Sequence, residues 1–257
     1  MTMPRGHSDP VGIWLAGDPA EIRDYLELGI VGLVTNTIVL DGLVDKYGPI
    51  LRVIEKYLEL QDELPLVVEV DADTAEDLVA VSQPFLKLSP RVVMKIPCTL
   101  KGLRTVARLK QEGRACMVTT TFSVSQAVAA AAAGAAYVAP FVGPTMDSGA
   151  DAREIVSDIV RVFAARNGSP YIAAGIVRTA LAAHVAIRAG CDGIVIFPKT
   201  YEEMLQHPGT AEWNTTFRRH WDSMGAKGAL EGLPGHAKPG VNGEAARPSP
   251  TQRKARV

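Results

Sequence analysis

The stretch Val92-Val93-Met94-Lys95-Ile96-Pro97-Cys98-Thr99 places a single lysine within an apolar run. On a buried strand alternate side chains face opposite sides, so Lys95 shares a face with Val93 and Pro97. Burial of a lysine lowers its pKa, and a neutral amine can attack a carbonyl group and form a Schiff base. The alternative is that Lys95 ends the strand with its ammonium group in water. The run alone leaves both interpretations open.

The length and charge of the chain limit its fold and partners. The 257 residues suit one large α/β barrel or two small domains, and 47% of them are apolar, which provides a large core. The net charge of -1 gives no overall field that would attract nucleic acid or an anionic membrane. We therefore expect a small molecule as the partner, with no nucleic acid and no membrane.

Cysteine usage and hydropathy indicate a cellular compartment. The three cysteines, Cys98, Cys116 and Cys191, lack metal-ligand spacing, which argues against a disulfide framework or a zinc site. No apolar segment reaches the roughly 18 residues of a membrane span, and the N-terminus lacks the apolar core of a signal peptide. These features predict a cytoplasmic protein without a bound metal.

Apolar runs that read as strands alternate with helical segments along most of the chain. The expected strands are residues 11–15, 30–36, 66–70, 92–97, 115–122, 135–140, 171–174 and 193–198. Their continuous Val/Ile character is typical of parallel strands that are covered on both faces. Eight strands that alternate with helices predict an α/β fold, a single (β/α)₈ TIM barrel. A doubly wound sheet is second, because residues 16–19 lack the glycine-rich turn that such folds usually carry.

Capping signals and helical periodicity predict the helices between these strands. The expected helices are residues 19–29, 43–60, 75–86, 99–112, 124–134, 151–166 and 180–189, and a capping box at residues 200–203 predicts the start of another.

The two ends of the chain differ from the middle in composition. Residues 1–10 are expected to be a flexible lead-in, residues 11–224 the barrel with a terminal helix, and residues 225–257 a disordered tail rich in Gly, Pro and basic residues. Trp213, Phe217 and Trp221 recur every four residues on the terminal helix. This stripe predicts packing against the barrel or a neighbouring subunit. For the basic C-terminal end, a solvated terminus is favoured over a nucleic-acid site.

Polar side chains follow several of the expected strands. These are Asn36, Glu69, Asp71, Lys95, Thr119, Thr121 and Arg178. In a (β/α)₈ barrel the working residues lie at the carboxyl ends of the strands, so we expect these groups to converge on one pocket. An amine, a carboxylate, an amide and hydroxyls together suit Schiff-base aldol chemistry.

Several linked motifs resemble the transaldolase family, specifically its short members, which include fructose-6-phosphate aldolase. VVMKIPCT at 92–99 is similar to the family's lysine strand "VxxKxPxT". Further matches are VTN at 34–36, VEVDA at 68–72, FS at 122–123 with QA at 126–127, and APFVG at 139–143. The similarity extends over about residues 11–224 with the motifs in order.

The resemblance implies a role for each matched residue. Lys95 would be the Schiff-base nucleophile, Glu69 the proton shuttle acting through a water, and Thr119 the residue that positions this water. Asn36 would hold a hydroxyl of the substrate, and the other implied substrate contacts are Thr35, Thr121, Phe122, Ala139, Gly175 and Arg178. The residues at positions 69 and 122, Glu69 and Phe122, resemble those of true transaldolases, since the aldolase branch tends to have glutamine and tyrosine at these positions. The family implies a sugar or sugar phosphate as substrate, no cofactor, and a homo-oligomer.

The chain departs from the family pattern at positions that touch the chemistry. Ala16 replaces an aspartate that assists C–C cleavage, Met117 replaces an asparagine, and Pro144 replaces the phosphate-binding arginine. Thr37 replaces a proline, and a phosphate-binding serine falls on Ala174 or Gly175. The chain is thus either a working transaldolase-type enzyme with an altered substrate or a degenerate homologue that binds a metabolite or partner. Retention of both the lysine and the glutamate favours the enzyme.

Overall fold

A computed structural model describes residues 10–164, 166 and 168–236 of the chain. Within it the chain divides into two compact units: the first ends at Leu205 and the second begins at Gln206. The expected flexible lead-in, except for Pro10, and most of the expected tail lie outside the described residues. Each unit is described by itself.

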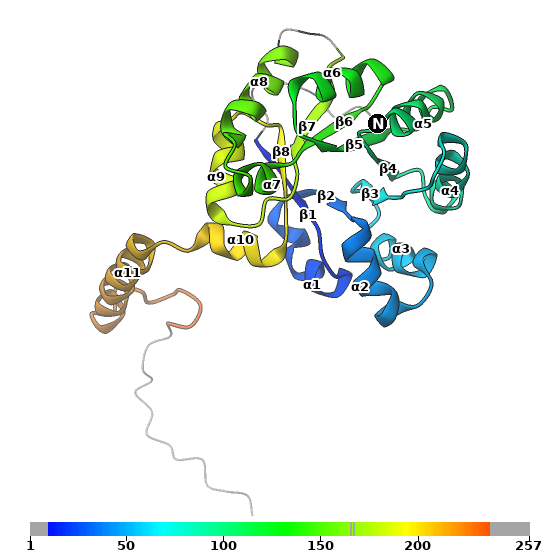
Figure 1. Cartoon of the computed structure of the whole chain (residues 1–257). Coiled ribbons are helices and arrows are strands. Elements are labelled where there is room, and N and C mark those ends of the chain that lie inside the picture. Colours follow the sequence, from blue (N-terminus) through cyan, green and yellow to red (C-terminus); the bar gives the residue numbers. More distant parts are fainter. Residues whose placement is uncertain (1–9, 165, 167, 237–257) are drawn as a thin grey trace, which may run out of the picture. The chain divides into compact units, whose positions relative to one another are not determined.

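The first unit is built on a closed barrel of parallel strands, in the order β1 to β8 with β8 paired to β1 (Figure 1). The strands are β1 Gly12–Leu15, β2 Ile30–Val34, β3 Leu66–Glu69, β4 Val92–Pro97, β5 Cys116–Thr121, β6 Tyr137–Pro140, β7 Tyr171–Ala174 and β8 Gly193–Ile196. This confirms the predicted (β/α)₈ barrel. Each observed strand falls within, or within one residue of, an apolar run that the sequence marks out.

Helices surround the barrel and connect its strands (Figure 1). They are α1 Pro19–Ile22 with a 3-10 extension at Arg23–Leu28, α2 Thr37–Tyr47, α3 Ile50–Leu58, α4 Ala75–Leu88, α5 Leu100–Gln111, α6 Val124–Ala133, α7 Val142–Asp147, α8 Ala152–Ala164, α9 Ala180–Arg188 and α10 Pro198–Leu205. Side chains of Asp18, Asn36, Thr74, Thr99, Ser123 and Thr179 accept hydrogen bonds from backbone N–H groups at helix starts. Such caps satisfy amides that the helix itself cannot pair.

Alternation along each strand separates two layers of core. On β4, Met94 and Ile96 point outward into the apolar layer beneath the helices, whereas Val93 points into the barrel. Lys95 therefore points inward as well, as the sequence predicts. Trp14 belongs to the core layer inside the barrel. A Cβ at position 32 would lie 2.2 Å from the Trp14 ring, which explains the glycine on β2.

Two predicted helices differ from the structure. The expected helix over 43–60 is two helices, α2 and α3, because Gly48 has φ +87° and Pro49 follows it. Apolar periodicity continues across this break and hides it. Asn36 caps α2, so that helix begins before residue 43. The capping box expected at 200–203 lies inside α10, which starts with Pro198.

The second unit contains α11, Pro208–Ala226, followed by turns to residue 236. Trp213 and Phe217 are exposed by about 60% and their ring centroids lie 5.4 Å apart. The expected disordered tail begins at 225, yet α11 continues to Ala226 and Leu230 in the following turns is buried. The homo-oligomer stays a prediction. In the described part of the chain, no helix combines the length and apolar character needed to cross a membrane.

Candidate active site

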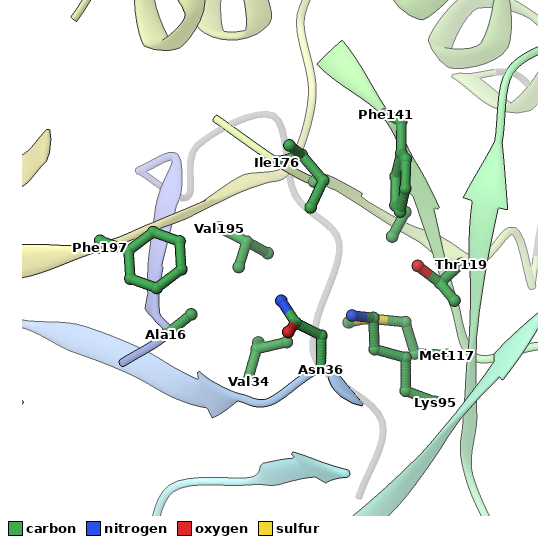
Figure 2. A pocket seen from close by; sticks show the side chains of 12 residues that line it. Ala16, Val34, Asn36, Lys95, Met117, Thr119, Phe141, Ile176, Val195 and Phe197 are labelled. Atoms are coloured by element: carbon green, nitrogen blue, oxygen red, sulfur yellow. The ribbon is translucent and has the colours of Figure 1, made fainter. Parts of the chain in front are cut away.

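A pocket opens at the carboxyl ends of the barrel strands, around Lys95 (Figure 2). Its lining residues come from β2, β4, β5, β6 and β8 and from the segments that follow β1, β2, β6, β7 and β8. They are Ala16, Val34, Asn36, Lys95, Met117, Thr119, Ala139, Phe141, Gly175, Ile176, Val195 and Phe197.

Lys95 lines this pocket, and only 5% of the residue is exposed. Its Nζ donates to Glu69 Oε2 at 2.9 Å and to the backbone carbonyl of Thr35 at 3.2 Å. Burial lowers the pKa of Lys95 below its usual value, and the charge and hydrogen bond of Glu69 oppose that shift in part. The dominant effect favours the neutral amine, which is the form that attacks a carbonyl carbon.

The register of neighbouring strands fixes what surrounds the lysine. Glu69 on β3 and Met117 on β5 both pair with Lys95 on β4. The carboxylate therefore lies on one side of the amine and a buried thioether on the other. Glu69 is 13% exposed and contacts Lys95 without lining the pocket itself.

Two further polar groups point into the pocket (Figure 2). Asn36 Oδ1 accepts from the backbone N–H of Val39 at 2.8 Å, which leaves its amide nitrogen facing the cavity. The Thr119 hydroxyl is buried without a hydrogen-bond partner among the described residues. An unpaired buried hydroxyl is costly, so this one is available to a water or a substrate. Thr120, the residue after Thr119, has a positive φ of 53°, which bends β5 at this point.

Of the remaining predicted site residues, two line the pocket, and Thr35 and Thr121 lie next to residues of the site. Ala139 and Gly175 line the pocket. The Thr35 side chain hydrogen-bonds the Val67 carbonyl, so Thr35 contacts the site through its own carbonyl oxygen. Thr121 lies beside the Cys98 thiol.

Phe122, Arg178 and Asp71 lie outside the pocket lining. Phe122 is 43% exposed and packs edge-on against Phe141, which does line the pocket. The Arg178 side chain is 60% exposed, with Nη1 3.8 Å from Asp147 Oδ2. Asp71 pairs with Lys101 at the surface.

Five apolar members of this lining were not predicted from the sequence: Val34, Phe141, Ile176, Val195 and Phe197. Val34 and Val195 could have been found from strand alternation, since they share the inward face with other core residues. Ile176 could not, because its φ of +55° is a conformation that β-branched residues rarely adopt. Phe141 and Phe197 follow β6 and β8 directly, where barrel site residues are expected.

Comparison with known proteins places this chain in a family. Residues 20–232 match the family described as transaldolase/fructose-6-phosphate aldolase. A probable transaldolase of Symbiobacterium thermophilum is 33% identical over 214 residues, covering 83% of this chain and 98% of the relative. A probable transaldolase of Caulobacter vibrioides is 32% identical over 209 residues, covering 81% and 96% of the two chains.

Solved structures resemble the chain in fold alone. The carboxyl transferase domain of Rhizobium etli pyruvate carboxylase has a TM-score of 0.57 and 10% identity, over 74% of this chain and 40% of that chain. A putative phosphonomutase from Burkholderia cenocepacia has a TM-score of 0.53 and 15% identity, over 76% and 89%. The family match and the relatives carry the assignment: this chain belongs to the transaldolase/fructose-6-phosphate aldolase family and is a transaldolase-type enzyme.

Proposed function

We propose that Lys95 forms a Schiff base with a ketose donor and that the enzyme transfers a three-carbon ketone unit, of the dihydroxyacetone type, to an acceptor aldehyde. The observation that carries this proposal is the buried amine of Lys95, 2.9 Å from Glu69 and facing the pocket at the barrel mouth. An amine held at low dielectric is neutral over a wider pH range than a free lysine.

The bonds made and broken follow from this amine. Nζ adds to the donor carbonyl carbon, and loss of one water leaves an iminium ion. The iminium accepts the electron pair of the bond between its α-carbon and its β-carbon, the first and second carbons beyond the iminium carbon, as that bond breaks. The β-carbon with its hydroxyl leaves as an aldehyde, and the α-carbon stays in an enamine. The enamine then attacks the acceptor aldehyde, and hydrolysis of the new iminium returns the free lysine.

Proton transfers in these steps fall to Glu69. Its carboxylate touches Lys95 and can take a proton from the amine and from the donor's β-hydroxyl, which loses that proton as the C–C bond breaks and becomes the aldehyde oxygen. The unpartnered Thr119 hydroxyl can hold a water between the carboxylate and the donor. Ala16 supplies no second acid or base, so Glu69 would carry both roles.

The resemblance and the relatives favour a sugar or sugar phosphate as substrate, with no cofactor. The replacements at Ala16, Met117 and Pro144 favour a specificity that differs from the family's usual donors. Arg178 is directed toward Asp147 rather than the pocket, which supports the same conclusion for phosphate.

Reductive trapping tests the covalent step. Borohydride with dihydroxyacetone, fructose or their phosphates should add the mass of the reduced donor to the peptide that contains Lys95. Lys95→Arg should abolish the addition, because a guanidinium stays protonated and forms no iminium. Lys101→Arg is the matched control, since Lys101 binds Asp71 outside the pocket. If no ketone labels the wild-type protein, the degenerate, non-catalytic homologue takes the place of this proposal.

A further inference from the structure

The pocket around Lys95 is unusually poor in polar groups for a site that handles sugars. Nine of its twelve lining residues have no nitrogen or oxygen in the side chain. Within the described lining, Lys95 is the single charged residue, and Asn36 and Thr119 are the other polar ones. Figure 2 shows apolar side chains on several sides of the Asn36 amide, among them Val34, Val195 and Phe197.

These polar groups can be assigned one by one. Lys95 bonds to the carbonyl carbon of the donor, and the Thr119 hydroxyl serves the water beside Glu69. Asn36 Oδ1 is already used by Val39, so its amide nitrogen remains for one donor hydroxyl. A dihydroxyacetone unit carries two hydroxyls next to its carbonyl. The second would face Ala16, Met117 or Val195 without a partner, and burying an unpaired hydroxyl is unfavourable.

The conformation of Ile176 is a second, independent observation. Its φ of +55° is a genuine outlier for a β-branched residue, and its carbonyl accepts from the backbone N–H of Gly143 at 3.1 Å. A Cβ on Gly143 would lie 2.5 Å from that carbonyl oxygen, so glycine permits the close approach. The outcome of this strained arrangement is an isoleucine side chain directed into the pocket (Figure 2). Strain maintained at this point adds apolar surface to the site.

We infer that the preferred donor unit is an alkyl hydroxymethyl ketone. It has one hydroxyl beside the carbonyl, held by Asn36, and on the other side an alkyl group that packs against the apolar side chains of Ala16, Met117 and Val195, here called the apolar wall. This inference rests on the proposed function and specifies its donor. The bonds made and broken are those given above, and the aldol products are sugars with a deoxygenated, alkyl-bearing first carbon. A substrate of this kind satisfies the few polar groups of the pocket and leaves none of its own hydroxyls unpaired.

Two ketones of equal size test the inference. 1-Hydroxy-2-butanone and dihydroxyacetone have the same number of heavy atoms and differ by a methyl group in place of a hydroxyl. The rate at which each labels Lys95 under borohydride is divided by its rate with N-acetyl-lysine methyl ester, which removes intrinsic reactivity. We expect the corrected ratio to favour 1-hydroxy-2-butanone by about tenfold or more, the factor that 1.4 kcal/mol represents.

Substitutions at Met117 and Val195 test whether the donor preference arises from these apolar side chains. Met117→Asn places an amide next to Lys95 and should move the ratio at least about tenfold toward dihydroxyacetone. Met117→Leu keeps an apolar side chain and should leave the ratio within a factor of about three, which is under 0.7 kcal/mol. Val195→Thr adds a hydroxyl at nearly constant volume and should move the ratio in the same direction as Met117→Asn, which guards against misfolding of the asparagine variant.

The outcomes separate the two proposals. Equal labelling by both ketones, or faster labelling by dihydroxyacetone, would overturn the alkyl-ketone inference and leave the Schiff-base function intact. Absence of labelling by either ketone and by the sugars would overturn the function itself. If neither Met117→Asn nor Val195→Thr changes the labelling ratio, the inference is also refuted, because the preference would then arise outside this pocket.

Discussion

A phosphate on the donor should contribute little to catalysis by this enzyme. The resemblance implies that an arginine after the PFVG motif binds phosphate in other members of the family, and here Pro144 stands in its place. An arginine fork that makes two charge-assisted hydrogen bonds, each worth about 1.5 kcal/mol at the low end, contributes about 3 kcal/mol. At 1.36 kcal/mol for each factor of ten, this corresponds to a preference of more than about 100-fold in kcat/KM.

Arg178 is the side chain that could replace the missing arginine. Its side chain is 60% exposed, with the guanidinium Nη1 3.8 Å from Asp147 Oδ2, and exposed pairs of this kind are worth about 1 kcal/mol or less. Little energy therefore holds Arg178 away from the pocket. We nevertheless expect the wild-type kcat/KM ratio of fructose 6-phosphate to fructose, with a common acceptor aldose, to be less than about ten, because no described cation other than Lys95 lines the site.

Two variants, Pro144→Arg and Arg178→Ala, test this expected ratio. Pro144→Arg should raise the ratio; position 144 is the third residue of α7, where backbone N–H groups lack a helical acceptor in any case, so the helix tolerates a non-proline residue. Arg178→Ala should leave the ratio unchanged. A wild-type preference near 100-fold that disappears in the Arg178 variant would show that Arg178 moves in to bind the phosphate, contrary to this reasoning.

Three further predictions follow from the site and the barrel. Glu69→Gln should move the pH midpoint of cyanoborohydride labelling at Lys95 to lower pH, because removing the carboxylate removes the effect that raises the lysine pKa, and it should also abolish turnover; an upward shift contradicts this. Gly102→Ala should lower the urea unfolding free energy by about 1–3 kcal/mol, since its Cβ would lie 2.1 Å from the Pro97 carbonyl oxygen, whereas Gly42→Ala, whose Cβ meets nothing within 4 Å, should not. Release of free ketone without an acceptor should be slower than transfer to an added aldose, as the resemblance to true transaldolases implies, and equal rates measured by product analysis would argue against it.

The barrel was predictable because each strand is a separate apolar run. Parallel strands covered on both faces need apolar side chains on every position, so they stand out against the helices. Capping signals also marked the starts of α4 and α5, where Thr74 and Thr99 are the observed N-caps. Asn36 was assigned only to the substrate, although it also caps α2. The break at Gly48 was missed because apolar periodicity continues across it, although the Gly48-Pro49 pair is itself a turn signal.

The site was predictable as far as strand geometry determines it. Glu69 is the last residue of β3 and pairs with Lys95 on the neighbouring β4, and this register accounts for their 2.9 Å contact. Arg178 lies in a loop, where side-chain direction depends on backbone angles that no periodicity encodes. The same holds for Ile176, because a φ of +55° is expected of glycine or asparagine and not of isoleucine.

The neighbours of Lys95 act on its amine with opposite sign. Glu69, across β3, raises the lysine pKa by its charge and its hydrogen bond, whereas burial, to which Met117 across β5 contributes, lowers it and is the larger effect. An asparagine at position 117 could accept a hydrogen bond from the ammonium and would weaken that lowering. The methionine therefore does two things at once: it removes a partner for a donor hydroxyl and it favours the nucleophilic form of the amine.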